Sequence, residues 1–258
     1  MGIGLDVPKL PVFFAIIIYT FFLLYYISKA RKGGNLFLRK IPGIEAVDEA
    51  VGRATEMGRA ILYIPGLSTI DDVATIAALN ILARVARKAG EYETDIIVPN
   101  RNPVVYTVAK EVVKQAYSTI GRPDLFKDES VFYVTDSQFG YTAAVCGLMV
   151  REKTATNFFM GYFWAESLLL AETGAATGAI QIAGTDAITQ LPFFITACDY
   201  TLIGEEFYAA SAYLSGEPVL VSTIKAQDAM KLIIGALILL GGFLGLIGKA
   251  GILNFLFP

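Results

Sequence analysis

The chain has 258 residues, of which 55% are hydrophobic and 17% are charged, and its formal net charge is −3. A soluble domain carries roughly a quarter charged residues, and a disordered chain combines high charge with low hydrophobicity. The composition therefore excludes a disordered chain and argues against an enzyme surrounded entirely by water. Histidine is absent, which excludes a Ser-His-Asp triad, a histidine metal ligand and histidine acid–base catalysis.

Two apolar stretches without charge frame the chain, residues 10–27 and 232–248. Each approaches the roughly 20 residues that a helix needs to cross a bilayer. No small-residue cleavage site follows the first stretch, and its positive charges come after it, so we expect an uncleaved anchor rather than a signal peptide. The second stretch carries Gly241 and Gly245 at a spacing that allows close helix packing in lipid. We expect a second span there, with a buried helix as the alternative.

A basic segment follows the first stretch, because residues 28–40 contain five cations and no acid. The positive-inside rule then predicts a cell (inner) membrane protein with two spans, whose central region is cytoplasmic. We expect the basic segment to lie at the membrane surface and to bind lipid, with a preference for anionic headgroups. Its residues are Lys29, Arg31, Lys32, Arg39 and Lys40.

Four regions follow from these stretches: an anchor over 1–30, a basic collar and linker helix over 31–60, an α/β domain over 61–228, and a C-terminal helix and tail over 229–258. Residues 41–231 contain 14 Lys and Arg against 23 Asp and Glu, a net charge of −9. Such an acidic region argues against nucleic acid as a partner. The two cysteines, Cys146 and Cys198, have no metal-binding or redox spacing, so we expect buried free thiols in a reducing compartment.

Short apolar runs that end in turn residues predict strands buried on both faces. Four such runs cover residues 61–64, 96–98, 131–134 and 179–182, and a further strand is expected at 218–223. A helix is expected over 71–89, with Ser68 and Thr69 as candidate N-caps. Its expected apolar stripe contains Val73, Ile76, Leu79 or Asn80, and Val85.

A second helix is expected to start at Pro103 after the N-cap Asn102 and to end at Gly121, and a linker helix is expected over 45–57. Strands that alternate with capped helices indicate a Rossmann-like, open, mostly parallel sheet with helices on both faces. The predicted fold is thus an α/β domain flanked by an N-terminal and a C-terminal transmembrane helix.

Residues 154–224 contain no Lys or Arg and seven acids. The segment is expected to form either the densest part of the core or a homo-oligomer interface, because interfaces are depleted in Lys and rich in aromatic residues. A carboxylate site for Mg²⁺ or Ca²⁺ is a weaker alternative. Other subunits of a membrane complex are further possible partners. The candidate interface residues are Phe158, Phe159, Met160, Tyr162, Phe163 and Trp164.

Ligands of open parallel sheets bind beyond the carboxyl ends of the strands, and helix N-termini there favour anions. The alternative is that each polar residue at these ends caps a helix or forms a turn. Glycine-rich nucleotide motifs and a G-x-S-x-G elbow are absent from the sequence. We therefore assign no catalytic residue, cofactor or metal, although Asp136 and Asp186 would be the first choices for carboxylate chemistry. The candidate ligand-binding residues are Ser68, Thr69, Asn100, Arg101, Asp136, Ser137, Thr185 and Asp186.

Several longer segments resemble a family of prokaryotic membrane-anchored proteins described only as a domain of unknown function. The resemblance covers residues 36–231 and implies a tethered cytoplasmic domain, but it implies no activity, cofactor or catalytic residue. The segments that carry it are LFLRKIPGI (36–44), VPNR (98–101), NFFMGY (157–162), AETGAATGAIQIAGTD (171–186), QLPFF (190–194) and ACDYTLIGEE (197–206).

These observations favour a non-enzymatic, homo-oligomeric membrane protein that acts as a scaffold or assembly component. The alternative is a membrane-tethered domain that binds or converts a small ligand, such as a nucleotide or phosphate, at the strand ends. A transport pore is a third option, but two uncharged spans could line a pore only in an oligomer.

Overall fold

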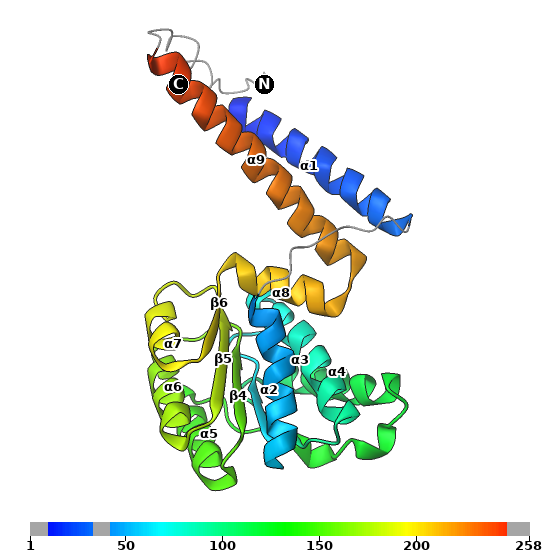
Figure 1. Ribbon diagram of the computed structural model, residues 1–258, viewed down its shortest axis with the longest axis vertical. Coiled ribbons are helices and arrows are strands. Elements are labelled where there is room, and N and C mark those ends of the chain that lie inside the picture. Colours follow the sequence, from blue (N-terminus) through cyan, green and yellow to red (C-terminus); the bar gives the residue numbers. More distant parts are fainter. Residues whose placement is uncertain (1–9, 33–41, 247–258) are drawn as a thin grey trace, which may run out of the picture. The chain divides into compact units, whose positions relative to one another are not determined.

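The computed structural model describes residues 10–32 and 42–246, which fall into two compact units divided near residues 38 and 216 (Figure 1). The first unit is a pair of long helices, and the second is an α/β domain. The candidate membrane-surface residues Arg39 and Lys40 lie outside the described residues.

The helix pair consists of α1 (Leu10–Arg31) and α9 (Pro218–Leu246), which run side by side in opposite directions (Figure 1). The Ser222 hydroxyl donates a hydrogen bond to the Tyr26 carbonyl at 3.2 Å. Both helices are long and apolar enough to cross a membrane, judged by length and composition alone. The end of the predicted second stretch, residues 247–248, lies outside the described residues.

The strand predicted at 218–223 is wrong, because these residues form the first turns of α9. Pro218 occupies the first helical position, where its fixed φ and missing N–H are tolerated. A short apolar run rich in valine fits a strand or a buried helix equally well, and only the length of the element distinguishes them.

The α/β domain contains a six-stranded parallel sheet in the order β3-β2-β1-β4-β5-β6. This confirms the predicted α/β class and parallel sheet, although the apolar runs did not predict β4 or β6. The winding reverses between β1 and β4, which pair with Ile61 opposite Thr156. The strands are β1 (Ile61–Ile64), β2 (Ile96–Asn100), β3 (Val131–Tyr133), β4 (Thr156–Met160), β5 (Ile180–Thr185) and β6 (Tyr200–Ile203).

Helices cover both faces of the sheet (Figure 1). One face carries α2 (Pro42–Met57), α3 (Val73–Glu91), α4 (Pro103–Thr119) and α8 (Glu205–Ser215). The other face carries α5 (Gln138–Glu152), α6 (Glu166–Thr177) and α7 (Leu191–Ala197). The expected linker helix is therefore α2, and it packs on the domain.

Side chains along β1 alternate between the two cores, since successive residues of a strand point to opposite faces. Ile61 and Tyr63 join the core beneath α2 and α3, whereas Leu62 and Ile64 join the core beneath α5 and α6. All four residues are fully buried. Each such side chain stabilises the fold by about 1.5–3 kcal/mol relative to an exposed one, which explains why the run is apolar without alternation.

Side chains that precede α3 and α4 accept hydrogen bonds from the first N–H groups of these helices. The Asn102 carboxamide oxygen accepts hydrogen bonds from the N–H groups of Val104 at 2.8 Å and Val105 at 3.2 Å, and Pro103 starts α4 as predicted. The N-cap of α3, however, is Asp72, which accepts from Ala74 N at 2.9 Å, so Ser68 and Thr69 are not its caps.

The stripe predicted for α3 is partly right, because Leu79 and Val85 are buried whereas Val73 and Ile76 are exposed. The buried face of α3 also contains several alanines, such as Ala74 and Ala78. These small residues let the helix approach the sheet closely, and a search for large apolar residues misses them.

We predict that Asn102→Ala lowers the free energy of unfolding by about 1 kcal/mol, because two N–H groups at the start of α4 lose their acceptor. Asn102→Asp should be nearly neutral, since aspartate caps equally well. Thermal unfolding of the full chain in mild detergent measures both variants. Equal losses for the two would show that the cap contributes nothing.

Candidate functional site

The switch point between β1 and β4 is where ligands of this topology are expected to bind. Here the loops that follow the two strands contact each other directly, because Leu67 N donates a hydrogen bond to Tyr162 O at 2.9 Å. Gly66 has a φ of +75° and Gly161 a φ of +121°. A Cβ atom on Gly66 would lie 2.8 Å from Tyr162 N, and one on Gly161 would lie 2.9 Å from Pro65 O. The backbones of the two loops are therefore in direct contact at the switch point.

Arg101 joins the loops at this edge of the sheet. Its Nη1 donates to Leu67 O at 2.8 Å and its Nε donates to Asp136 O at 2.9 Å. The guanidinium carbon lies 5.0 Å from the ring centroid of Trp164, a cation–π contact. The Arg101 side chain, which follows β2, thus contacts the loops after β1, β3 and β4. Its Nε and Nη1 both donate to backbone carbonyls of the protein itself.

Most of the other predicted ligand-binding residues also bond to their own chain. Asn100 is fully buried and donates to Val98 O at 2.9 Å and to Phe132 O at 3.3 Å. Ser137 caps α5 by accepting from Gly140 N at 3.3 Å. Thr185 accepts from Ala187 N at 3.1 Å, and Thr69 donates to Asp71. The cap and turn interpretation therefore accounts for Ser137, Thr185 and Thr69. Asn100 instead ends β2, and its buried Oδ1 has no hydrogen-bond partner among the described residues. Ser68 and Asp136 lie in loops at the same edge.

Asp186 does not begin a helix, since α7 starts at Leu191. Its Oδ2 accepts a hydrogen bond from the Tyr208 hydroxyl at 2.5 Å, which ties the end of β5 to α8. Burial raises the pKa of Tyr208, and the hydrogen bond to Asp186 and the charge of Asp72 raise it further. Sequence reasoning missed Tyr208, because a partner on α8 is distant along the chain and belongs to no motif.

Glu166 is a fully buried carboxylate at the first position of α6. Its Oε1 accepts from Trp164 N at 2.7 Å and its Oε2 accepts from Gln138 Nε2 at 2.5 Å. This position at the start of a helix is one where the helix dipole favours an acid. Over residues 10–32 and 42–246, no group of three or more acidic or cysteine side chains could hold a metal ion.

The aromatic run proposed as an interface lies mostly inside the chain. Phe158, Phe159, Met160 and Phe163 are fully buried in the domain core, so the core interpretation applies to them. Tyr162 and Trp164 are partly exposed. Their rings meet edge to face with centroids 5.9 Å apart, beside Arg101.

The two cysteines are free and partly exposed, which corrects the expectation of buried thiols. Burial of its sulfur nevertheless raises the pKa of Cys198 to about 12, and the charge of Asp199 adds to the shift. Cys146 lies on α5, where the Thr173 hydroxyl donates to its sulfur at 3.3 Å.

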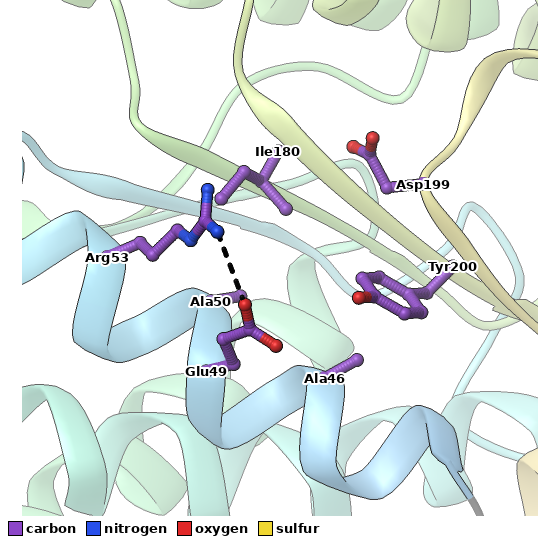
Figure 2. A pocket seen from close by; sticks show the side chains of 7 residues that line it. All are labelled: Ala46, Glu49, Ala50, Arg53, Ile180, Asp199 and Tyr200. Atoms are coloured by element: carbon purple, nitrogen blue, oxygen red, sulfur yellow. Dashed lines mark ion pairs between the residues drawn. The ribbon is translucent and has the colours of Figure 1, made fainter.

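A hollow of about 340 Å³ lies at the opposite, amino-terminal edge of the sheet (Figure 2). Arg53 and Glu49 extend into it from α2 and form an ion pair at 3.5 Å, while Asp199 and Tyr200 face them from the start of β6. Asp199 Oδ2 accepts from Gln181 N at 2.8 Å. The sequence did not indicate this hollow, since its residues form no motif. The remaining lining residues are Ala46, Ala50 and Ile180.

Residues 4–256 match the model of a family described as Domain of unknown function (DUF6754). The chain belongs to this family. No curated protein and no solved structure matches it. The expected resemblance to a family of unknown function thus holds for nearly the whole chain, and DUF6754 brings no activity with it.

For this DUF6754 chain, we predict that Gly66→Ala lowers the free energy of unfolding by about 3 kcal/mol. The methyl group adds left-handed strain of about 1–2 kcal/mol and overpacks against the Tyr162 backbone. Gly121→Ala is the matched control, because its φ is +73° but nothing lies within 4 Å of its Cβ position. It should show the strain alone. Equal losses in thermal unfolding would contradict the contact between the loops.

We predict that Arg101→Lys lowers the free energy of unfolding by about 2 kcal/mol, since lysine cannot bond both carbonyls and stack on the indole. Trp164 is the only tryptophan of the chain, so its fluorescence follows unfolding and should shift to the red in the native variant. Arg151→Lys, in an exposed pair with Glu152, should change stability by less than about 0.5 kcal/mol. Indistinguishable variants would show that Arg101 does not hold the loops.

We predict slow alkylation of Cys198 at neutral pH, because the thiolate is the reactive form and its pKa of about 12 leaves little thiolate. Maleimide labelling followed by peptide mass spectrometry measures the site. Denaturant should make Cys198 react at the rate of an ordinary thiol. Fast labelling of the native chain would contradict the shift.

Proposed function

We propose that this chain is a non-enzymatic scaffold or assembly component, which α1 and α9 anchor in the cell membrane as a homo-oligomer. The observation that carries the proposal is the exposure of this helix pair. In the most apolar part of α1 no residue is classed as buried, and in that of α9 only 6% of the residues are. A core helix of a soluble protein would be covered, and an apolar surface of this size in water indicates a membrane or a partner.

The packing of α1 against α9 supports a retained anchor rather than a cleaved signal sequence. A signal peptide leaves the mature protein, whereas α1 here supplies the surface on which α9 packs and the carbonyl that Ser222 contacts. Lys29, Arg31 and Lys32 end the charge-free part of α1. Under the positive-inside rule they favour a cytoplasmic position for the α/β domain.

The strand-end edge supports a structural rather than a catalytic role. Arg101 holds the chain's own loops there, and the loops after β1 and β4 contact each other at the switch point. A domain built in this way offers rigid surfaces to partners, which suits an assembly component.

The membrane proposal is tested by expressing the full chain and washing the membranes with alkaline carbonate, which strips peripheral proteins. We expect the chain to remain in the pellet. Protease protection in inverted vesicles should leave the α/β domain accessible, and native mass spectrometry in mild detergent should show oligomers. Release by carbonate, or a uniform monomer in detergent, would refute the anchor or the oligomer respectively.

The hollow of Figure 2 favours a second candidate, a membrane-tethered domain that binds a small ligand. Its volume lies at the lower end of the range for ligand sites. Arg53 would bind an anionic group, while Asp199 and the Tyr200 ring would bind a cationic one, so a small zwitterion fits the lining. Nucleotides and phosphates bound at the strand ends are the other ligands to compare.

A thermal-shift panel of amino acids, nucleotides, sugar phosphates and divalent ions tests this candidate. A ligand at a hundred times its dissociation constant adds about 2.7 kcal/mol of stability. Arg53→Gln should abolish the response to a zwitterion, and Arg151→Gln on α5 should preserve it. A panel without any response would rule out binding of these ligand classes.

A further inference from the structure

Within the described part of the chain, β6 is the last strand on one side of the sheet, so one of its sides is open (Figure 1). Alternate residues of a parallel strand turn their N–H and C=O groups toward the neighbouring strand. Gly204 N donates to Thr185 O at 2.9 Å, and Thr185 is the register partner of Ile203. Leu202 and Gly204 therefore bond toward β5, whereas the N–H and C=O groups of Thr201 and Ile203 point to the open side.

The open side of β6 is apolar on both faces of the sheet. Tyr200, on the face that carries α2, is 40% exposed. Ile203 is 42% exposed and lies on the face of α7, where the Thr201 hydroxyl donates to Phe194 O at 3.4 Å and Ile195 is 54% exposed. Natural edge strands are commonly protected by lysine, proline or a bulge. β6 contains neither lysine nor proline, so its sequence leaves the edge available for pairing.

The hollow of Figure 2 lies beside this edge, because Tyr200 belongs to both. Its ring lines the hollow, and its strand forms the edge. Successive side chains of a strand point to opposite faces of a sheet, so every second side chain of a strand added to β6 would extend over the hollow. The volume of about 340 Å³ exceeds the roughly 150 Å³ of a cavity that holds benzene. The hollow therefore accommodates a long side chain.

The charges around the edge favour a basic partner. Asp199 precedes β6, and Glu205 and Glu206 follow it. The hollow is lined by two carboxylates, Glu49 and Asp199, and one guanidinium, Arg53, which gives a formal net charge of −1. A second copy of this edge would bring the same acids, and like charges that meet across a contact disfavour it.

We propose that β6 is a docking edge for an extended segment of a partner protein in which basic and apolar residues alternate. The segment adds a strand to the sheet and bonds to the backbone of Thr201 and Ile203, the mode of recognition known as β-augmentation. Its apolar side chains pack against Ile195 and Ile203, and its basic side chains extend over the hollow toward Asp199 and Glu49. The contact deepens the proposed role in assembly by naming the kind of partner, and it depends on neither the anchor nor the homo-oligomer.

A fluorescent peptide of eight residues that alternates valine and lysine is the probe. Its anisotropy is measured against the purified full chain in mild non-ionic detergent, and we expect saturable binding. A peptide that alternates valine and glutamate should bind more than about tenfold more weakly, because its charges repel the acids of the edge. The valine–lysine peptide methylated on every backbone nitrogen keeps its charges but cannot donate to β6, and it should not bind.

Substitutions at Thr201 separate the backbone of the edge from its side chains. Thr201→Pro removes one outward N–H, and an edge strand tolerates proline where the N–H faces solvent. It should weaken peptide binding by about fivefold to tenfold, the effect of one hydrogen bond. Thr201→Val keeps the N–H and is the matched control, which should bind like the unchanged chain. Circular dichroism checks that both variants are folded.

Substitutions in the hollow test the charge of the partner. Asp199→Asn keeps an oxygen that accepts from Gln181 N, and Glu49→Gln keeps the length of the side chain. Each should weaken binding of the valine–lysine peptide by about twofold to fivefold, as expected for partly exposed charge pairs. Glu152→Gln on α5, in an exposed ion pair with Arg151, is the matched control and should leave binding unchanged.

Hydrogen exchange of the unmodified full chain tests the edge without any substitution. Bound peptide should slow amide exchange in residues 199–204 by about tenfold, because the outward N–H groups become bonded. Exchange in residues 131–133, which form β3, should not change. This measurement also decides the matter if Thr201→Pro fails to fold.

Four outcomes would overturn the proposal. Equal binding of the methylated peptide would show attraction by charge without an added strand. Displacement of the peptide by free lysine at the same concentration would assign the hollow to a small ligand. Exchange in residues 199–204 that is slow without peptide and speeds up on dilution would assign the edge to a second copy. No binding and no slowing would refute the docking edge, while the carbonate and mass-spectrometry results for the anchor and the oligomer would still stand.

Discussion

Burial of the central strands on both faces is the constraint on which the α/β domain depends. All residues of β1 and β4 are buried, so helices must cover each side of the sheet. Right-handed crossovers meet this need by sending successive helices to one face and then to the other. The same winding brings the carboxyl ends of β1 to β4 to one edge, where Arg101 reaches three neighbouring loops.

The strand order is that of nucleotide-binding folds, but the loops at this edge are held in close contact. Gly66 and Gly161 let the loops after β1 and β4 approach to backbone contact. Fold alone does not imply function. Arg101, whose residue type is common in anion-binding sites, here donates its hydrogen bonds to carbonyl groups of the chain's own loops.

The charge deficit of the chain has two separate physical causes. In residues 154–224 it reflects a core, because Phe158, Phe159 and Phe163 lie between the sheet and its helices. In α1 and α9 it reflects apolar surface that the chain does not cover. The apolar surface that the described residues leave uncovered therefore lies on the helix pair rather than on the aromatic run.

The sequence by itself determined the elements whose cause is local. Apolar runs predicted β1, β2, β3 and β5, and Asn102 with Pro103 predicted the start of α4, because hydrophobic burial and capping act within a few residues. It left β4 and β6 undetected and mistook the first turns of α9 for a strand, since short apolar runs suit either structure. Only the tertiary structure decided that Arg101 bonds to two loops and that Tyr208 donates a hydrogen bond to Asp186. Each of these depends on residues that are distant in sequence, which no local pattern encodes.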